Sequence, residues 1–202
     1  MIKRIYYLIF SLLSTTVIAN TPIKLEIYKN QAEKSILSND LNALKINILD
    51  AFKNENQYSK IDFAAFYLLR AKYYKAISNN KLAESDIDTV LKYDIKNMEA
   101  YLLKTSFLKS ADDQIKLLQN GINVVENKIP LIKQQALIKI GLTAAFWDNA
   151  MYNSEPFSIE KANKEITIAK GGCFQLSNIM NIDEEAKALY EKKCKIEAIK
   201  NF

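Results

Sequence analysis

Residues 66–101 read FYLLRAKYYKAISNNKLAESDIDTVLKYDIKNMEAY, and this stretch decides the fold that the sequence predicts. Around its first half, apolar residues recur at spacings of three and four, which places them on one side of an α-helix; they are Ala64, Tyr67, Leu68, Ala71, Tyr74 and Ile77. Asn79-Asn80 then breaks the pattern, because asparagine tolerates the left-handed end of one helix and caps the start of the next. A second stripe follows at Leu82, Ala83, Ile87, Val90 and Leu91. The stretch therefore predicts a helical hairpin.

This hairpin resembles a tetratricopeptide repeat, in which small residues let two antiparallel helices approach and aromatic residues fill the gap to the next pair. The positions that match the repeat pattern are Tyr67, Ala71, Tyr74, Ala83, Ile87 and Val90. Two positions depart from it: Arg70 stands where the repeat has Leu, and Ile95 stands where it has Pro.

Weaker copies of the pattern lie on both sides of the hairpin, so that the resemblance covers most of residues 25–170. Upstream, residues 24–38 and 41–53 are predicted to form a first helix pair, and a further pair is predicted to begin at Met98. One helix pair cannot bury its apolar face alone, so neighbouring pairs must stack. The resemblance implies an all-α fold of stacked antiparallel helix pairs, a degenerate tetratricopeptide-like α-solenoid. An unrelated helical array or bundle is the alternative.

The C-terminal third continues the helical pattern. Pro130 suits the first turn of a new helix, and residues 131–152 form a long apolar helix in this interpretation. Ser158 is predicted to cap a helix over 159–170, which Gly171-Gly172 would end. Asn181 and Glu184 then resemble a capping box for a last helix over 182–200. Its lysine-rich side predicts a polar C-terminal capping helix of the stack.

The N-terminus, residues 1–19, reads MIKRIYYLIFSLLSTTVIA and has the three parts of a secretory signal peptide. A basic start is followed by an apolar run that is shorter than the about 20 residues of a membrane span. Cleavage after Ala19 would leave one domain over 20–202, exported to the periplasm or secreted, with no stable membrane insertion. An uncleaved anchor or a buried helix is the alternative.

The chain has two cysteines, Cys173 and Cys194. In an exported protein such a pair indicates a disulfide, which here would staple the last helix to the preceding one. A redox-active pair is less consistent with the spacing, which is not CxxC, and two free thiols are the remaining alternative.

Catalytic chemistry finds little support in the composition. The chain has no histidine, which excludes Ser-His-Asp and Cys-His catalysis and removes the commonest zinc ligand. No Gly-rich phosphate loop is present. The net charge is +5, but lysines and acids are interspersed, unlike the clustered basic stripe of a nucleic-acid-binding protein. We therefore expect no enzyme activity, no cofactor, no metal site and no nucleic-acid partner.

The resemblance implies instead a groove for a protein or peptide, lined by the first helices of successive pairs. On the alignment above, the groove residues are Lys29, Glu33, Leu68, Lys72, Lys75, Leu102, Lys109, Trp147 and Met151. Their basic and apolar mixture suits an acidic or carboxylate-terminated peptide. The alternative is that these lysines are simply solvated and that Trp147 belongs to the core. The sequence thus predicts an exported, non-enzymatic binding scaffold, or else a structural or envelope-assembly protein that self-associates through residues 131–152.

Overall fold

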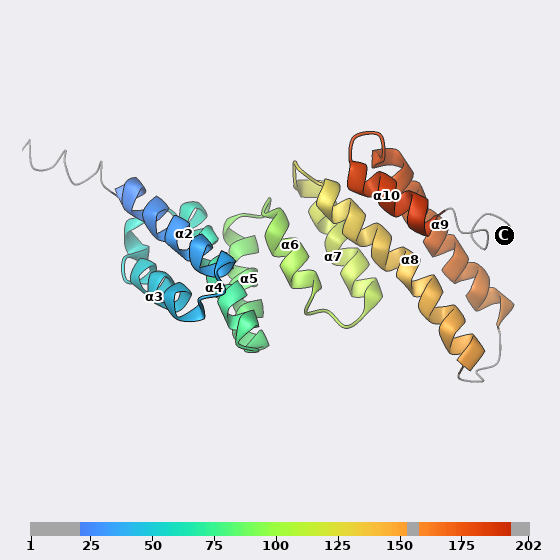
Figure 1. Cartoon of the computed structure of the whole chain (residues 1–202), viewed down its shortest axis with the longest axis horizontal. Coiled ribbons are helices and arrows are strands. Elements are labelled where there is room, and N and C mark those ends of the chain that lie inside the picture. The colour runs from blue at the N-terminus through green and yellow to red at the C-terminus, as the bar shows by residue number, and fades with distance from the viewer. Residues whose placement is uncertain (1–20, 153–157, 195–202) are drawn as a thin grey trace, which may run out of the picture. The chain divides into compact units, whose positions relative to one another are not determined.

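A computed structural model describes residues 21–152 and 158–194 of the chain (Figure 1). Within these residues the fold is all-α, without a strand, and inside each compact unit the helices pack against their neighbours in sequence, as predicted. The helices are α2 (Thr21–Leu37), α3 (Leu41–Phe52), α4 (Lys60–Ala76), α5 (Asn80–Tyr93), α6 (Met98–Thr105), α7 (Ala111–Val124), α8 (Ile129–Tyr152), α9 (Ile159–Ile179) and α10 (Glu184–Lys193), with a short 3₁₀-helix, η1, at Glu55–Gln57. The predicted signal peptide, residues 1–19, lies outside the described residues.

The chain divides between Asp94 and Ile95 into two compact units. Both fall within the single domain predicted over 20–202, and each is described by itself. The first unit contains α2 to α5, and the second contains α6 to α10.

The two helix pairs of the first unit turn in the same way. Shortly after each first helix, one residue has a positive φ, 55° at Asn39 and 60° at Ser78. The following residue, Asp40 or Asn79, donates its backbone N–H to the last turn of that helix at 2.8 Å and caps the next helix with its side chain. This is a Schellman end joined directly to an N-cap. The sequence interpretation assigned the left-handed residue to Asn79-Asn80; it is Ser78, because Asn79 takes a φ of −89° to cap α5.

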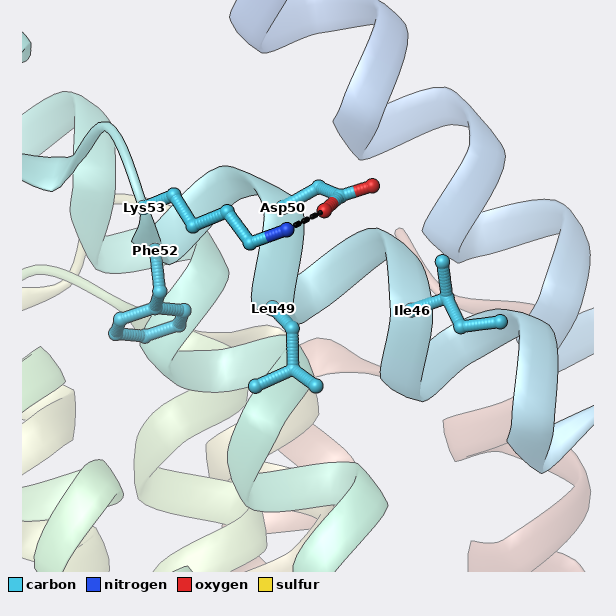
Figure 2. Close-up of a pocket in the computed structure, with 5 residues that line it drawn as sticks. All are labelled: Ile46, Leu49, Asp50, Phe52 and Lys53. Carbon is cyan, nitrogen blue, oxygen red and sulfur yellow. Dashed lines mark hydrogen bonds and ion pairs between the residues drawn. The ribbon is translucent and has the colours of Figure 1, made fainter.

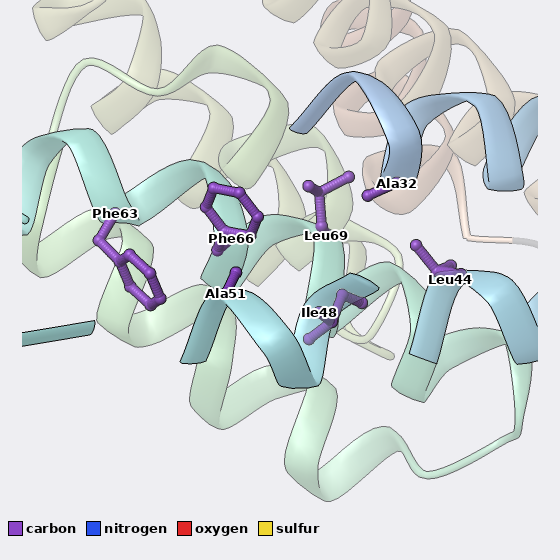
Figure 3. Close-up of a cluster of buried hydrophobic side chains, with 7 residues drawn as sticks. All are labelled: Ala32, Leu44, Ile48, Ala51, Phe63, Phe66 and Leu69. Atoms are coloured by element: carbon purple, nitrogen blue, oxygen red, sulfur yellow. The ribbon is translucent and has the colours of Figure 1, made fainter. Parts of the chain in front are cut away.

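The core of the first unit lies between α2, α3 and α4 (Figure 3). Two alanines, Ala32 and Ala51, are completely buried there and let the helices approach closely, while Phe63 and Phe66 of α4 are the largest fully buried side chains. In the second helix pair, the predicted positions Ala71, Ala83, Ile87 and Val90 are also completely buried. The small-and-large pattern of the sequence therefore identifies the centres of the buried faces, but two residues of the predicted stripes, Ile77 and Leu82, are exposed because they lie next to the turn between the helices.

The second unit corrects one predicted helix end. Gly171 and Gly172 do not stop a helix, because α9 continues through both to Ile179. Neither glycine has a positive φ. A Cβ on Gly172 would lie 2.8 Å from the carbonyl oxygen of Ala136, whereas one on Gly171 would meet nothing within 4 Å. Gly172 is therefore the residue at which α9 approaches the backbone of α8, and its role is tertiary packing rather than helix termination.

The last helix, α10, spans Glu184–Lys193, so it begins two residues after the predicted start at 182, while the predicted end at 200 lies outside the described residues. Its cap is Asp183, whose carboxylate accepts a hydrogen bond from the backbone N–H of Ala186 at 2.7 Å, so the predicted capping box at Asn181 and Glu184 is wrong. α10 buries Ala186 and exposes most of its charged side chains, and residues 195–202 lie outside the described residues. The predicted disulfide is confirmed: Cys173 of α9 is bonded to Cys194, the residue that ends α10.

Candidate functional site

In the first unit, the structure places the predicted groove residues on two helices. Lys29 and Glu33 lie on α2, the first half-buried and the second exposed. On α4, spacings of four and three put Leu68, Lys72 and Lys75 on one stripe. Leu68 is only 7% exposed, which leaves little of this side chain for a ligand. Lys72 is half-buried, and Lys75 is exposed.

The remaining groove residues belong to the second unit. Leu102 is half-buried on α6, and Lys109 is exposed in the connection beyond the end of that helix at Thr105. Trp147 and Met151 lie in α8, but their side chains are outside the described part of the chain. The nine residues are divided between the two units, so the structure does not test whether they form one site. The groove stays a prediction.

A hollow that the sequence interpretation missed lies on α3 of the first unit. It has a volume of about 500 Å³ and is lined by Ile46, Leu49, Asp50, Phe52 and Lys53 (Figure 2). Ile46 is 59% exposed and Leu49 is 51% exposed, although both are large apolar residues. We refer to these five residues as the α3 hollow.

The α3 hollow exists because α3 is apolar on two sides. Successive residues turn by about 100° around a helix, so Ile46 and Leu49 point away from the side that carries Leu44 and Ile48. Leu44 and Ile48 are buried in the core of the unit, whereas Ile46 and Leu49 face outward. The sequence contains this signal, since residues 41–52 read LNALKINILDAF and carry more apolar residues than one buried face requires.

An ion pair lies along one edge of the α3 hollow. The Lys53 ammonium donates to a carboxylate oxygen of Asp50 at 2.7 Å, and the hydrogen bond to Asp50 raises the pKa of Lys53 above its ordinary value. Both side chains are exposed, so this pair adds little to stability. Its effect is to place one positive and one negative group at the rim of an apolar surface.

The aromatic ring of Phe52 is held firmly in place. It meets the rings of Phe63 and Tyr67 edge-on, with centroids 4.8 and 5.1 Å away. The guanidinium carbon of Arg70 lies 3.8 Å from the centroid of Phe52, within the range of a cation–π interaction. Phe52 therefore presents a fixed surface to the hollow rather than a mobile side chain.

Arg70 is fixed in turn by Asp86 of α5. Nε and Nη2 of Arg70 donate to the two carboxylate oxygens of Asp86, each at 2.7 Å, and Asp86 is only 5% exposed. Burial opposes the charge on Arg70, but the hydrogen bonds and charge of Asp86 outweigh it, so that the pKa of Arg70 is raised. The sequence interpretation took Arg70 only as a departure from the repeat pattern, and so missed this pair.

Tyr67, whose ring contacts the ring of Phe52, is itself held by a hydrogen bond. Its hydroxyl donates to Oε1 of Glu55 at 2.6 Å. Burial, followed by this hydrogen bond, raises the pKa of Tyr67 to about 12. The connection 54–59, which contains Glu55, is thereby fastened to α4.

Other site types find no candidate in the described part of the chain. Across residues 21–152 and 158–194, no group of three or more Cys, Asp or Glu side chains is arranged to hold a metal ion. None of the helices in the same ranges is long and apolar enough to cross a membrane. No protein-family model, curated protein or solved structure matches the chain. The α3 hollow is thus the candidate site of the first unit, and its chemistry is that of apolar contact.

Proposed function

We propose that this protein is an exported, non-enzymatic scaffold that binds a protein or peptide partner, with the α3 hollow as one contact surface. The observation that carries the proposal is the fixed ring of Phe52 beside the exposed side chains of Ile46 and Leu49. The cores of protein interfaces are rich in aromatic and apolar residues, and rigid anchors lose little entropy on binding.

Export is supported by two independent features. The first is the signal-peptide pattern of residues 1–19. The second is the disulfide between Cys173 and Cys194, since disulfides persist mainly in oxidising compartments such as the periplasm or the exterior of the cell.

The alternative, self-association through residues 131–152, gains no support from the described part of α8. Its apolar residues Leu131, Ala136 and Ile140 are buried within the second unit. They are therefore not available to a second copy unless the unit opens.

The test is affinity capture from an envelope extract of the producing cells, using the mature, oxidised chain as bait. We expect Ile46→Ser and Leu49→Ser each to reduce recovery of a specific partner at least fivefold. Ile61→Ser is the matched control, because Ile61 is 62% exposed and lies outside the hollow. If the unmodified chain and all three variants recover the same amount of the partner, the α3 hollow has no role in binding it.

A separate double variant tests the predicted basic groove. A chain that carries both Lys72→Glu and Lys75→Glu should bind an acidic partner more weakly without unfolding. An unchanged affinity would remove the charged groove while leaving the α3 hollow in place.

A further inference from the structure

The exposed side of α3 points directly away from the core of the first unit. Ile46 is two positions from the buried Leu44 and two from the buried Ile48. At about 100° per residue, it therefore lies about 160° around the helix from each of them. Leu49 lies about 140° from Leu44. The core residues of α2 and α4 contact the opposite side of α3, so among the described residues this side is open to another helix.

This exposed side has the residue spacing of a coiled-coil seam. Asn42, Ile46, Leu49 and Lys53 follow one another at intervals of four, three and four residues. The a and d positions of a heptad repeat have the same spacing. With Ile46 at position a, Leu49 falls at position d. In parallel coiled coils, a β-branched residue at a together with Leu at d favours two helices over larger assemblies.

The α3 hollow matches the place that receives a side chain in such a pair. In a coiled coil, each a or d side chain inserts between four residues of the facing helix. For a d side chain in a parallel pair, these four are an a residue, the following d and e residues, and the next a residue. In α3 they are Ile46, Leu49, Asp50 and Lys53, and all four line the hollow, with Phe52 as its fifth residue (Figure 2). The hollow therefore corresponds to the hole that Leu49 of a second copy would fill.

Two opposite charges flank the seam. Lys45 precedes Ile46 at position g, and Asp50 follows Leu49 at position e. In a parallel pair with two-fold symmetry, a g residue of one helix meets the e residue five positions later on the other, so Lys45 of each copy faces Asp50 of its mate. Oδ1 of Asp50 already accepts from Lys53, but a carboxylate has a second oxygen that can accept from another ammonium.

An antiparallel pair suits the same residues less well. In that arrangement g positions lie beside g positions, and e positions lie beside e positions. Lys45 would then lie beside Phe52 of the second copy, and Asp50 would lie beside Ala43. No opposite charges would meet across the seam. The charge pattern of α3 therefore favours the parallel arrangement.

We propose that the occupant of the α3 hollow is a second copy of this chain, whose α3 packs parallel to the first across a two-fold axis. The inference rests on the contact role proposed above for the α3 hollow and names its partner. At the seam, Ile46 meets Ile46 and Leu49 meets Leu49, and a Lys45–Asp50 pair lies on each side. This contact is much smaller than a standard protein interface, so the dimer is weak and dissociates on dilution.

Sedimentation equilibrium of the mature, oxidised chain, from micromolar to millimolar concentration, tests this assignment. We expect a monomer–dimer equilibrium. Leu49→Ser removes the side chain that fills the hollow of the second copy and should weaken the dimer at least tenfold. A chain that stays monomeric at every concentration, or a Leu49→Ser variant that dimerises as strongly as the unmodified chain, overturns the proposal.

Two charge variants test the parallel arrangement. Lys45→Asp places two acids opposite each other on both sides of the seam, and Asp50→Lys places two bases there, so each variant alone should dimerise about fivefold more weakly. In an equimolar mixture of the two, the mixed dimer regains an attractive pair on each side and should recover the unmodified affinity within about twofold.

The matched control for these charge variants is Lys81→Asp, at an exposed position of α5, which should dimerise like the unmodified chain. If the separate charge variants dimerise as strongly as this control, or if their mixture associates no better than either alone, the parallel pairing is wrong.

These results separate self-pairing from the scaffold function. If the chain is monomeric while Ile46→Ser and Leu49→Ser still reduce capture of a different protein, the hollow binds that protein and only the self-pairing is lost. If the chain dimerises as expected while both variants capture other proteins normally, the hollow serves self-association and its role toward a separate partner is lost.

Discussion

Arg70 of α4 and Asp86 of α5 form a two-point ion pair, with both hydrogen bonds at 2.7 Å. The pair links the two helices of the central hairpin. It also holds the guanidinium against the ring of Phe52, 3.8 Å from the ring centroid. A single interaction therefore stabilises the hairpin and fixes one wall of the α3 hollow.

Asp86→Ala leaves the Arg70 guanidinium without its partner in a site where its side chain is only 26% exposed. Removing one member of a buried pair is strongly destabilising, so we expect a loss of about 3 kcal/mol in the free energy of unfolding. Urea denaturation measures it. Glu84→Ala, at an exposed position of the same helix, should change the value by less than about 0.5 kcal/mol. Equal effects of the two substitutions would contradict the pairing.

Gly172→Ala and Gly171→Ala should act in opposite directions although the residues are adjacent. The added methyl at Gly172 would lie 2.8 Å from the backbone oxygen of Ala136, so overpacking should cost about 1–3 kcal/mol. At Gly171 the methyl meets nothing within 4 Å, and alanine should stabilise α9 by up to about 1 kcal/mol. Thermal denaturation of both variants is the measurement. A stabilising Gly172→Ala would refute the close approach of α8 and α9.

The raised pKa of Tyr67, about 12, predicts a loss of stability in alkali. In the unfolded chain the phenol ionises near its ordinary value of 10.0, so the folded state keeps the proton longer. The contribution is complete below pH 10 and is lost as the pH rises through 12. Tyr67→Phe should therefore flatten the decline of the unfolding free energy between pH 10 and 12. A variant whose unfolding free energy declines as steeply over this range as that of the unmodified chain would contradict the raised pKa of Tyr67.

Reduction of the disulfide between Cys173 and Cys194 should destabilise the second unit. The bond closes a loop with a sequence separation of 21, which corresponds to about 3 kcal/mol in the chain-entropy model. Urea denaturation with and without reductant measures the difference, and a variant carrying Ser at both positions should match the reduced chain. If the oxidised and reduced chains unfold at the same urea concentration, the disulfide does not stabilise the second unit.

Much of the fold could be predicted because it depends on local periodicity. Ala71, Ala83, Ile87 and Val90 are buried as the repeat pattern indicates, and Ser158 caps α9 as predicted. Spacings of three and four report which side of a helix is covered, and side-chain caps act over three residues.

The sequence predictions failed where contacts between different helices determine the structure. Gly172 is typical of a helix end in sequence, but its lack of a side chain serves the crossing of α8 and α9. Arg70 and Asp86 are sixteen positions apart, and nothing in either helix alone indicates that they meet. The α3 hollow was overlooked for a related reason: the apolar residues of α3 predict a buried helix, and only the packed structure separates the covered Ile48 from the exposed Ile46.

The turn between α9 and α10, residues 180–183, lies inside the ring closed by Cys173 and Cys194. A protease that cuts the backbone in this turn would leave two polypeptides still joined covalently. The clipped molecule would keep its full mass in the absence of reductant and would separate into two fragments only after reduction. In a protease-rich environment, α10 would thus survive a cut that detaches the corresponding helix from a chain without the bridge.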